Sequence, residues 1–238
     1  IINKMKKFNG KAIYQPAGKA QEYAQWACNF YVGCSNGCTY CYLKKGIGKA
    51  VLGGDKPTLK KCFKDEAHAF EVFEKELMQN IDELRKHGIF FSFTTDPMLD
   101  ETWLLTLNAA EMAVHNLVPV KILTKMADWV DNFIYWLDNS NSYNKEIDWR
   151  KMYAFGFTLT GHDEIEPGSS TNAERIEAMK KLHDAGFRTF ASIEPVIDFE
   201  SSLEMIIQSA RFCDLYKIGL ESVRNMIRKK LNYFFFRA

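Results

Sequence analysis

The chain alternates between two patterns of hydrophobic and polar residues. Short runs of apolar, β-branched and aromatic residues are typical of strands, whereas longer stretches with an apolar residue every three or four positions are typical of helices. The runs that predict strands cover residues 27–33, 89–94, 118–124, 152–160, 188–196 and 214–220. Because predicted helices separate these strands, the pattern predicts βα units and a parallel sheet.

The helices are predicted from the spacing of their apolar residues. The first ends at Gly88, and its apolar face consists of Phe70, Phe73, Leu77, Ile81 and Leu84. The second covers residues 101–115, and the third continues through Trp136. Two stretches between the regular elements are predicted to be loops, the glycine-rich residues 46–54 and the polar residues 138–148.

Two later helices have recognisable start signals. Thr171-x-x-Glu174 has the form of a capping box at the start of a fourth helix, and Gly186 is expected to end that helix. Ser201-x-x-Glu204 predicts a similar start for a fifth helix. The inner face of that fifth helix is expected to consist of Leu203, Ile206, Ile207 and Ala210.

Six βα units, fewer than the eight of a closed barrel, predict a partial (β/α)6 TIM-like barrel that is open on one side. Residues 1–26 then form an N-terminal extension, residues 27–220 the barrel, and residues 221–238 a C-terminal helix or tail. The open side would let a large substrate approach the mouth. In such barrels the chemistry lies at the carboxyl ends of the strands, so functional residues are expected there.

Composition narrows the class of protein without identifying it. Hydrophobic residues make up 47% and charged residues 26% of the 238 residues, which is ordinary for a soluble globular protein. The formal net charge of +1 gives no overall field that would attract nucleic acid or a membrane surface. No apolar run approaches the length of a membrane span, and the first residues lack the apolar region of a signal peptide. We therefore expect a cytoplasmic monomer that does not contact a membrane.

Three cysteines stand close together after the first predicted strand. Cys34, Cys38 and Cys41 have the spacing C-x3-C-x2-C, and three thiolates on one loop can hold three irons of a cubane [4Fe–4S] cluster. Leaving out a fourth protein ligand keeps one iron open for a substrate or cofactor, as in catalytic metal sites. The loop follows a strand at the barrel mouth, so the motif and the predicted fold agree.

A zinc site is the alternative for these cysteines, with Cys28 or Cys62 as the fourth ligand. Structural zinc sites usually combine two C-x2-C pairs, or one such pair with histidines. This sequence has no second pair, and its five histidines show no H-x3-H spacing. Six cysteines in 238 residues are also too few to indicate a disulfide framework. The spacing therefore favours the cluster over zinc.

Polar residues stand at the carboxyl ends of the other predicted strands. Thr95 and Asp96 follow the second strand, Lys125 the third, and Glu194 ends the fifth, while Thr158 lies on the fourth. A lysine can neutralise a carboxylate, and threonine hydroxyls can bind ribose or an amino acid group. The competing interpretation is that such residues cap the next helix or, for Lys125, face solvent.

Arg175 is placed unusually, in the first turn of the fourth predicted helix. A cation there opposes the helix dipole, which indicates a partner, either an acidic neighbour or the carboxylate of a cofactor. Glu194 has three open interpretations: an acid that faces the substrate, a general base, or a buried partner of Arg175.

These residues resemble the spore photoproduct lyase-like branch of the radical S-adenosylmethionine (SAM) superfamily. The resemblance extends from residue 14 to residue 220, and its most specific segments are residues 33–43, 123–125, 166–168, 174–178, 185–187 and 194–196. It implies a [4Fe–4S] cluster on the three cysteines, with SAM on the open iron. It further implies reductive cleavage of SAM to a 5′-deoxyadenosyl radical that abstracts hydrogen from a substrate, and an electron donor such as flavodoxin or ferredoxin.

The resemblance also assigns roles to single residues. Thr95, Lys125 and Thr158 match positions that contact SAM in this branch, and Asp96, Arg175 and Tyr40 are further candidates for such contacts. Tyr40 and Tyr42 match tyrosines near the cluster, where a tyrosine relay of hydrogen atoms is implicated.

The chain also departs from the lyases. The lyases carry a cysteine on the second strand as hydrogen-atom donor, and the matching residue here is Phe93, which has no S–H group. The basic and aromatic residues of the C-terminus could bind a single nucleic acid strand or form a docked helix, and they are Arg224, Arg228, Lys229, Lys230 and Tyr233 to Phe236. Photoproduct repair in DNA and a non-catalytic iron–sulfur or zinc protein therefore stay open as alternatives.

Overall fold

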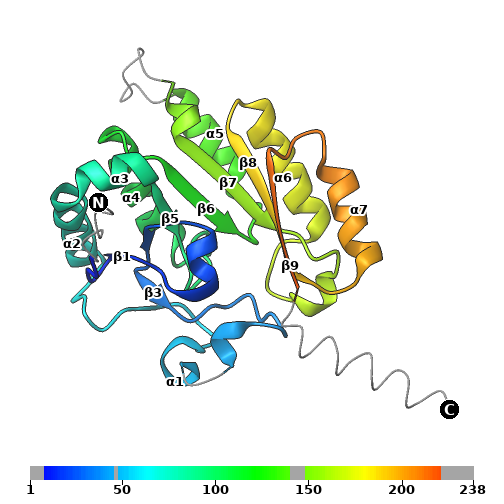
Figure 1. The fold of residues 1–238 in the computed structure, drawn as a ribbon, viewed down its shortest axis with the longest axis horizontal. Helices are drawn as coiled ribbons and strands as arrows, with labels where there is room; N and C mark the ends of the chain where they lie inside the picture. The colour runs from blue at the N-terminus through cyan, green and yellow to red at the C-terminus, as the bar shows by residue number, and fades with distance from the viewer. Residues whose placement is uncertain (1–7, 46–47, 140–147, 221–238) are drawn as a thin grey trace, which may run out of the picture.

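The computed structural model describes residues 8–45, 48–139 and 148–220. Its main feature is one seven-stranded sheet with the order β1-β2-β5-β6-β7-β8-β9 (Figure 1). The strands of this sheet are β1 Ile13–Tyr14, β2 Ala27–Cys28, β5 Ile89–Phe91, β6 Val120–Thr124, β7 Tyr153–Thr158, β8 Arg188–Val196 and β9 Leu215–Leu220. Within this sheet, β1 is antiparallel to β2, and each of the following strands is parallel to its neighbour.

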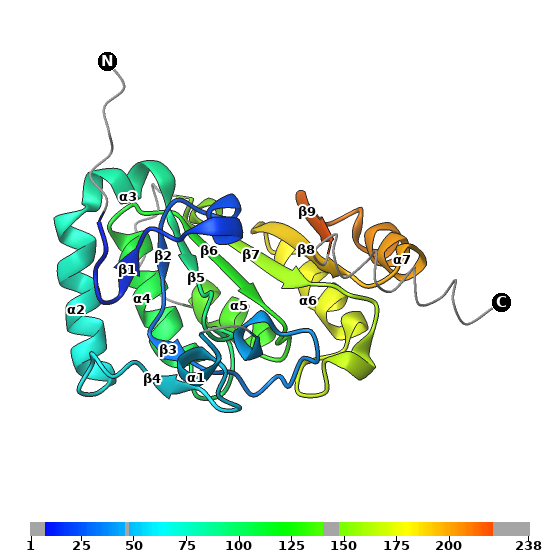
Figure 2. The same ribbon diagram turned by 60° about the horizontal axis from the view of Figure 1, so that its bottom comes forward.

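This topology confirms the predicted partial barrel, because six parallel strands follow one another in chain order and the sheet does not close. The helices are α1 Lys49–Leu52, α2 Glu66–Gln79, α3 Ile81–His87, α4 Trp103–His115, α5 Val130–Asn139, α6 Asn172–Asp184 and α7 Phe199–Ser209. A second, two-stranded sheet joins β3 Tyr31–Val32 to β4 Thr58–Leu59. Figure 2 shows the N-terminal segment (blue) on the side of the sheet away from α4 and α5.

The first predicted strand is divided into β2 and β3, which belong to different sheets. The chain bends at Asn29, whose side-chain oxygen accepts hydrogen bonds from the hydroxyl of Ser92 and from the backbone N–H of Phe93, both at 2.9 Å. The backbone bonds of these residues change partner at the same point, since Asn29 N–H donates to the carbonyl of Ala12 and the carbonyl of Phe30 accepts from Lys60 N–H. The predicted first helix is likewise divided, at Asn80, into α2 and α3.

The fourth predicted helix begins as expected. Thr171 is the N-cap of α6, and both hydrogen bonds of the capping box with Glu174 are present. Gly186 follows the helix with a φ of +89°, a left-handed conformation that glycine adopts without strain. The predicted loop at residues 138–148 lies largely outside the described residues, and so does the predicted C-terminal segment 221–238. The glycine-rich stretch contains the single-turn helix α1.

The prediction for the fifth helix was wrong in its cap and in its buried face. Asp198 is the N-cap of α7, and its side chain accepts a hydrogen bond from Ser201 N–H at 2.8 Å. Leu203 and Ile207 are 57% and 61% exposed. The buried positions include Ser209, whose hydroxyl donates to a backbone carbonyl of its own helix, so that its burial leaves no polar group without a partner.

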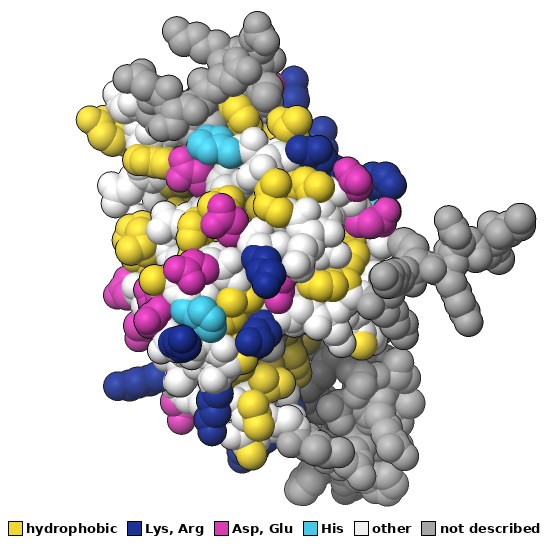
Figure 3. Space-filling model, turned by 90° about the vertical axis from the view of Figure 1, so that its left-hand side faces the viewer, with side chains coloured by type: hydrophobic (Ala, Val, Ile, Leu, Met, Phe, Trp, Pro, Cys, Tyr) yellow, Lys and Arg dark blue, Asp and Glu magenta, His cyan; other side chains and the backbone are white. Residues whose placement is uncertain are grey.

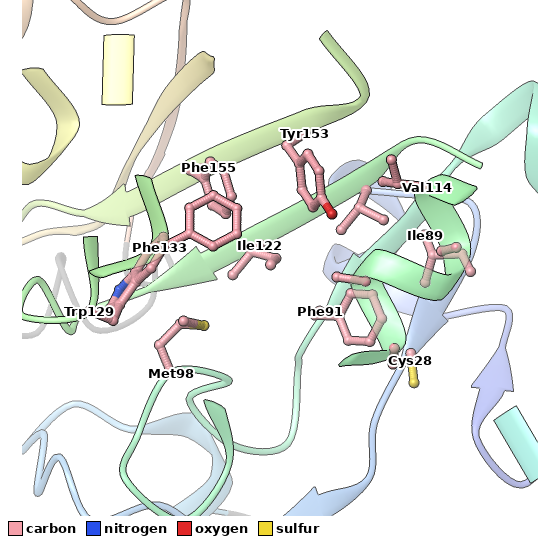
Figure 4. Packing of buried hydrophobic residues seen from close by; sticks show 14 of the residues in the cluster. Cys28, Ile89, Phe91, Met98, Val114, Ile122, Trp129, Phe133, Tyr153 and Phe155 are labelled. Atoms are coloured by element: carbon pink, nitrogen blue, oxygen red, sulfur yellow. The ribbon is translucent and has the colours of Figure 1, made fainter. Parts of the chain in front are cut away.

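The core lies between the sheet and the helices that cover it. In Figure 4, Phe133 of α5 faces Phe155 of β7, and the centroids of their rings are 5.2 Å apart. Tyr153, on the same strand, has its ring 5.8 Å from that of Phe133. These aromatic contacts fix α5 against β7 and thereby place the end of β7 relative to β6.

On the face shown in Figure 3, acidic and basic side chains are interspersed among hydrophobic ones. Within the described residues, no helix has the length and apolar character needed to span a membrane.

Candidate functional site

A cavity of about 640 Å³ lies at the carboxyl ends of the parallel strands, and all three cysteines of the predicted cluster loop line it. Most of the other residues that the sequence singled out line it too: Tyr40, Tyr42, Thr95, Asp96, Lys125, Thr158 and Glu194. Arg175 is the exception, because its side chain is fully buried and does not line the cavity. The predicted site is therefore one continuous hollow in the structure.

The cysteine loop is held against the segment that precedes α6. Thr39 N–H donates to the carbonyl of Ile165 at 3.0 Å, and Gly168 N–H donates to the carbonyl of Asn36 at 2.9 Å. The two backbones approach so closely that a Cβ atom at Gly168 would lie 2.5 Å from the carbonyl oxygen of Ser35. Glycine at this position therefore allows the loop to be clamped by backbone hydrogen bonds on both sides of Cys38.

Asp96 joins the cysteine loop to two strand ends. Its carboxylate accepts hydrogen bonds from Asn36 Nδ2 at 2.9 Å, Thr124 Oγ1 at 2.6 Å, Lys125 N–H at 2.8 Å and Met98 N–H at 3.0 Å. The side chain is buried, and both of its oxygens are used within the protein. Asp96 therefore positions the cysteine loop and the backbone at Lys125. A SAM group that bonds to Asp96 would have to share the carboxylate oxygens with these four protein donors.

Tyr40 is held by a buried ion pair. Its hydroxyl donates to Glu166 Oε1, and Glu166 Oε2 lies 2.7 Å from Nη1 of Arg175, with both charged side chains fully buried. The guanidinium also donates to the carbonyls of Thr158 and Ser170, each at 2.7 Å. Because these contacts run from the cysteine loop to the end of β7, they fix the loop relative to the sheet.

The position of Arg175 in the sequence indicated a negatively charged partner, and the structure identifies that partner as Glu166. The partner of this cation is Glu166, so the interpretation of Glu194 as its buried partner was wrong. The side chain of Arg175 is fully buried and does not line the cavity, and its Nη2 has no hydrogen-bond partner within the described residues, so the SAM contact predicted for it stays a prediction.

Three groups on the cavity wall remain available to a ligand. Thr95 Oγ1 is buried and has no hydrogen-bond partner within the described residues. Lys125 Nζ lies 5.7 Å from the centroid of the Tyr40 ring, within the range of a cation–π contact. Thr158, at the end of β7, pairs in register with Ser192 of β8, and both side chains line the cavity. A hydroxyl without a partner, a cation and a strand-end hydroxyl are the kinds of group that bind a polar cofactor.

Tyr42 differs from Tyr40 in its surroundings. Its side chain is 64% exposed, and its hydroxyl donates to the backbone carbonyl of Phe93. The hydroxyl of Tyr42 is therefore directed to the backbone of Phe93, whereas the hydroxyl of Tyr40 is directed to Glu166.

Burial makes the thiolate forms of two cysteines unfavourable in the protein alone. It raises the pKa of Cys34 to about 11, and the nearby charge of Asp96 adds to this effect. Burial likewise raises the pKa of Cys38. Cysteines bind metals as thiolates, so iron binding at this loop must release protons.

The three cysteines suit a cluster better than a single metal ion. Across the described ranges, no three His, Cys, Asp or Glu side chains converge closely enough to hold one ion. Around a cubane the sulfurs stand farther apart than around one ion, because each thiolate binds a different iron. Of the two candidates for a fourth zinc ligand, Cys28 is fully buried in the core, and Cys62 is exposed and does not line the cavity. The donor set and its spacing therefore fit a [4Fe–4S] cluster.

Sequence reasoning missed part of the cavity wall. Tyr23, from the predicted N-terminal extension, bonds through its hydroxyl to Ser192 Oγ at 2.8 Å and donates to Glu194 Oε2. Its ring meets that of Phe93 edge to face, with centroids 6.0 Å apart. No motif surrounds Tyr23, so only the packing of the extension over the sheet reveals it. Glu166 was noticed as part of a motif, but its role as the partner of Arg175 was not.

Comparisons with known proteins agree with this geometry. A family model described as the radical SAM superfamily matches residues 28–213. An uncharacterized protein of Methanocaldococcus jannaschii is 24% identical over 206 residues, which cover 81% of this chain and 69% of that protein.

Solved structures show a similar fold. A spore photoproduct lyase variant with bound AdoMet and dinucleoside spore photoproduct matches with a TM-score of 0.62 and 18% identity, over 92% of this chain and 60% of that chain. SuiB of Streptococcus suis, bound to its precursor peptide SuiA, matches with a TM-score of 0.55 and 12% identity, over 81% of this chain and 38% of that chain. At such identities the likeness shows the fold alone, and this chain spans well under two thirds of either protein.

Proposed function

The chain belongs to the radical SAM superfamily, and from this membership we propose that Cys34, Cys38 and Cys41 hold a [4Fe–4S] cluster beside a bound SAM. When bound, the reduced cluster and SAM supply a 5′-deoxyadenosyl radical that abstracts a hydrogen atom from a substrate. The observation that carries the proposal is that the three thiols and the strand-end polar groups line one cavity.

The cavity wall would hold and orient the cofactor. Thr95 offers a buried hydroxyl without a protein partner, which can bond to a polar group of SAM at no cost to the fold. Lys125 Nζ lies 5.7 Å from the centroid of the Tyr40 ring of the cysteine loop, where it can neutralise the carboxylate of SAM. Thr158 is buried at the end of β7, at a suitable place for a ribose hydroxyl.

Other residues keep the loop in place and limit water in the cavity. Asp96 and Glu166 hold the cysteine loop through Asn36 and Tyr40, and so fix the position of the thiols. Apolar side chains form much of the rest of the lining, and they include Leu43, Leu52, Phe93 and Leu123. Such a lining favours radical chemistry because it leaves few groups and little water to react with the radical.

Tyr42 is the better placed of the two tyrosines for a hydrogen-atom relay. Its hydroxyl contacts the backbone of Phe93, the residue that matches the lyase cysteine, while Tyr40 is committed to Glu166. We assign Tyr40 to holding the loop beside SAM and Tyr42 to any relay between the cavity and the substrate. Since Phe93 has no S–H group, the substrate radical is quenched differently from that of the lyases. We therefore propose a substrate other than spore photoproduct, with a low-potential flavodoxin or ferredoxin as the electron donor.

Anaerobic reconstitution tests the proposal. The protein purified with iron and sulfide should show iron–sulfur absorbance, and dithionite with SAM should yield 5′-deoxyadenosine. Cys38→Ala should abolish both signals, whereas Cys62→Ala should preserve them, because Cys62 is exposed and does not line the cavity. Zinc in place of iron, or a cluster that yields no 5′-deoxyadenosine, would refute the proposed function. Assays with ultraviolet-damaged DNA would separate lyase-like repair from other reactions.

A further inference from the structure

Glu194 is a charged residue on the cavity wall for which the proposed function has no use. It lies on β8, and its side chain is 22% exposed. The carboxylate rests against the backbone of Gly219 on β9, where a Cβ atom would collide with Oε1. Glycine at position 219 therefore leaves room for this carboxylate at the edge of the cavity.

Within the described residues, one of the two carboxylate oxygens of Glu194 has no hydrogen bond. Oε2 accepts from the hydroxyl of Tyr23. Lys217 Nζ is 3.9 Å from Oε1, which is too far for a hydrogen bond, and it instead bonds to Glu22 at 2.6 Å. Within the described part of the chain, no donor is hydrogen-bonded to Oε1 of Glu194. This oxygen is thus available to a ligand in the cavity.

Aromatic rings flank the carboxylate. The ring of Tyr23 meets that of Phe93 edge to face at 6.0 Å, and Phe93 stacks on Phe90 with centroids 4.4 Å apart. Tyr23, Phe93, Ser192, Glu194 and Gly219 all line the cavity, and we call these five residues the Glu194 wall. The wall combines a rigid aromatic surface with one carboxylate oxygen that lacks a donor.

We propose that the Glu194 wall binds a substrate group that joins a flat or apolar body to a nitrogen-bound hydrogen, such as an amine or amidinium. The N–H would donate to Glu194 Oε1 while the apolar body packs on Phe93, since Lys217 Nζ already lies over the Tyr23 ring, 4.6 Å from its centroid. This inference rests on the proposed function, because it takes the cavity to be the substrate cavity. Of the three interpretations of Glu194, the proposal takes that of an acid that faces the substrate. Glu194 is not the partner of Arg175, because Arg175 is paired with Glu166.

Charge favours a cationic donor over an anionic group. A carboxylate repels phosphate and carboxylate groups, and the nearest cation, Lys217, divides its charge between Glu194 and Glu22. Hydrogen bonds from a cation to a carboxylate are roughly twice as strong as those between neutral groups. Lys19 also lines the cavity, but its side chain is exposed to solvent.

Three small probes of the same size test the proposal on the reconstituted protein. The dissociation constants of 2-phenylethylamine, 2-phenylethanol and phenylacetate are measured anaerobically by calorimetry or NMR titration. The amine should bind roughly tenfold tighter than the alcohol, the difference expected of a hydrogen bond to a charged group, and phenylacetate should bind more weakly than both. Glu194→Gln should remove the preference for the amine. Glu204→Gln, a control at an exposed acid of α7 outside the cavity lining, should retain it.

Two results would overturn the inference: no saturable binding of the amine, or an amine preference that survives in Glu194→Gln. A thermal melt of each variant shows whether it is folded, and Glu194→Asp, which withdraws the carboxylate by one methylene and should weaken the preference, supplies the comparison if Glu194→Gln is not folded. Formation of 5′-deoxyadenosine is measured on the same samples. Intact SAM cleavage without amine preference refutes the Glu194 wall alone, whereas amine binding without SAM cleavage refutes the proposed function.

Discussion

Arg175 and Glu166 form an ion pair in which Nη1 and Oε2 are 2.7 Å apart and both side chains are fully buried. The pair also positions the cysteine loop, because the other carboxylate oxygen of Glu166 accepts a hydrogen bond from the hydroxyl of Tyr40, two residues after Cys38. Two buried charges are costly to remove from water, and further hydrogen bonds offset part of this cost: Glu166 Oε2 also accepts from Thr160 Oγ1, whereas Arg175 Nη2 has no partner within the described residues. The position of the cysteine loop is therefore linked to a charge pair behind the cavity.

Breaking this pair should destabilise the protein strongly. In Glu166→Gln the guanidinium of Arg175 stays buried without a counter-charge, and we expect a loss of about 3 kcal/mol or more in the free energy of unfolding. Urea denaturation monitored by circular dichroism measures it. The double variant Glu166→Gln/Arg175→Met should regain part of the loss. A single variant within about 0.5 kcal/mol of wild type would show that the pair contributes little, as exposed pairs do.

Tyr40 and Tyr42 should respond differently to loss of the hydroxyl. Tyr40→Phe leaves a buried oxygen of Glu166 without its donor, so we expect a cost of about 1–3 kcal/mol and faster loss of iron to a chelator. The Tyr42 side chain is 64% exposed. Tyr42→Phe should therefore change stability by less than about 0.5 kcal/mol. Equal iron release from the two variants would contradict the clamping role of Tyr40.

Thr95 should affect SAM binding without affecting the fold. Its buried hydroxyl has no partner within the described residues, so Thr95→Val removes no protein hydrogen bond. We expect an unfolding free energy within about 0.5 kcal/mol of wild type and SAM binding weakened by roughly fivefold, the value of one neutral hydrogen bond. Equilibrium dialysis with labelled SAM measures the affinity. Asp96→Asn is the contrasting variant, because it disrupts a carboxylate that accepts four hydrogen bonds and should lower stability.

His162 predicts a pH dependence of stability. Hydrogen bonds to Asp198 and Glu164 raise its pKa in the folded protein above the usual value, so folding favours the protonated form. The resulting stabilisation is fully present below the unfolded pKa of about 6.5 and is lost as the pH rises through the folded pKa. The unfolding free energy should fall from pH 6 towards pH 8.5 in wild type. The decline should be smaller in His162→Gln, and an unchanged slope would remove His162 as its cause.

Two substitutions in α7 test which face of this helix is buried. Leu203 is 57% exposed, so Leu203→Gln should change stability by less than about 0.5 kcal/mol. Met205 is buried, so Met205→Ala should cost about 2 kcal/mol or more. Thermal unfolding of the two variants under the same conditions shows which substitution lowers stability more. The reverse order of stability would support the face that the apolar spacing predicted.

The sequence predicted those elements whose signals are local. β8 has the predicted bounds because a short run with Phe190, Ile193 and Val196 among its residues follows Gly186, and α6 starts at its capping box because both partners lie within four residues. The division of the first strand depends on Asn29 and its bonds to Ser92 and Phe93, more than sixty positions away. No local pattern could have revealed those partners.

The same distinction applies to the site. The cysteine spacing and the polar residues after each strand indicated the cavity lining, because parallel strands bring their carboxyl ends together. The partner of Arg175 could not be deduced, since two carboxylates, Glu166 and Glu194, were compatible with its position. Tyr23 was missed because it enters the cavity from a segment without regular strands or a motif, and only tertiary packing places it beside Glu194.

The residues that line this cavity are widely separated in the sequence, so the ribosome makes them at different times and in a fixed order. Cys34 emerges early from the ribosome, its clamp Glu166 much later, and Glu194 and Gly219 near the end of the described chain. A nascent chain therefore carries the three thiols proposed to bind iron long before Glu194 and Gly219, on the side of the cavity proposed to recognise the substrate, have been made.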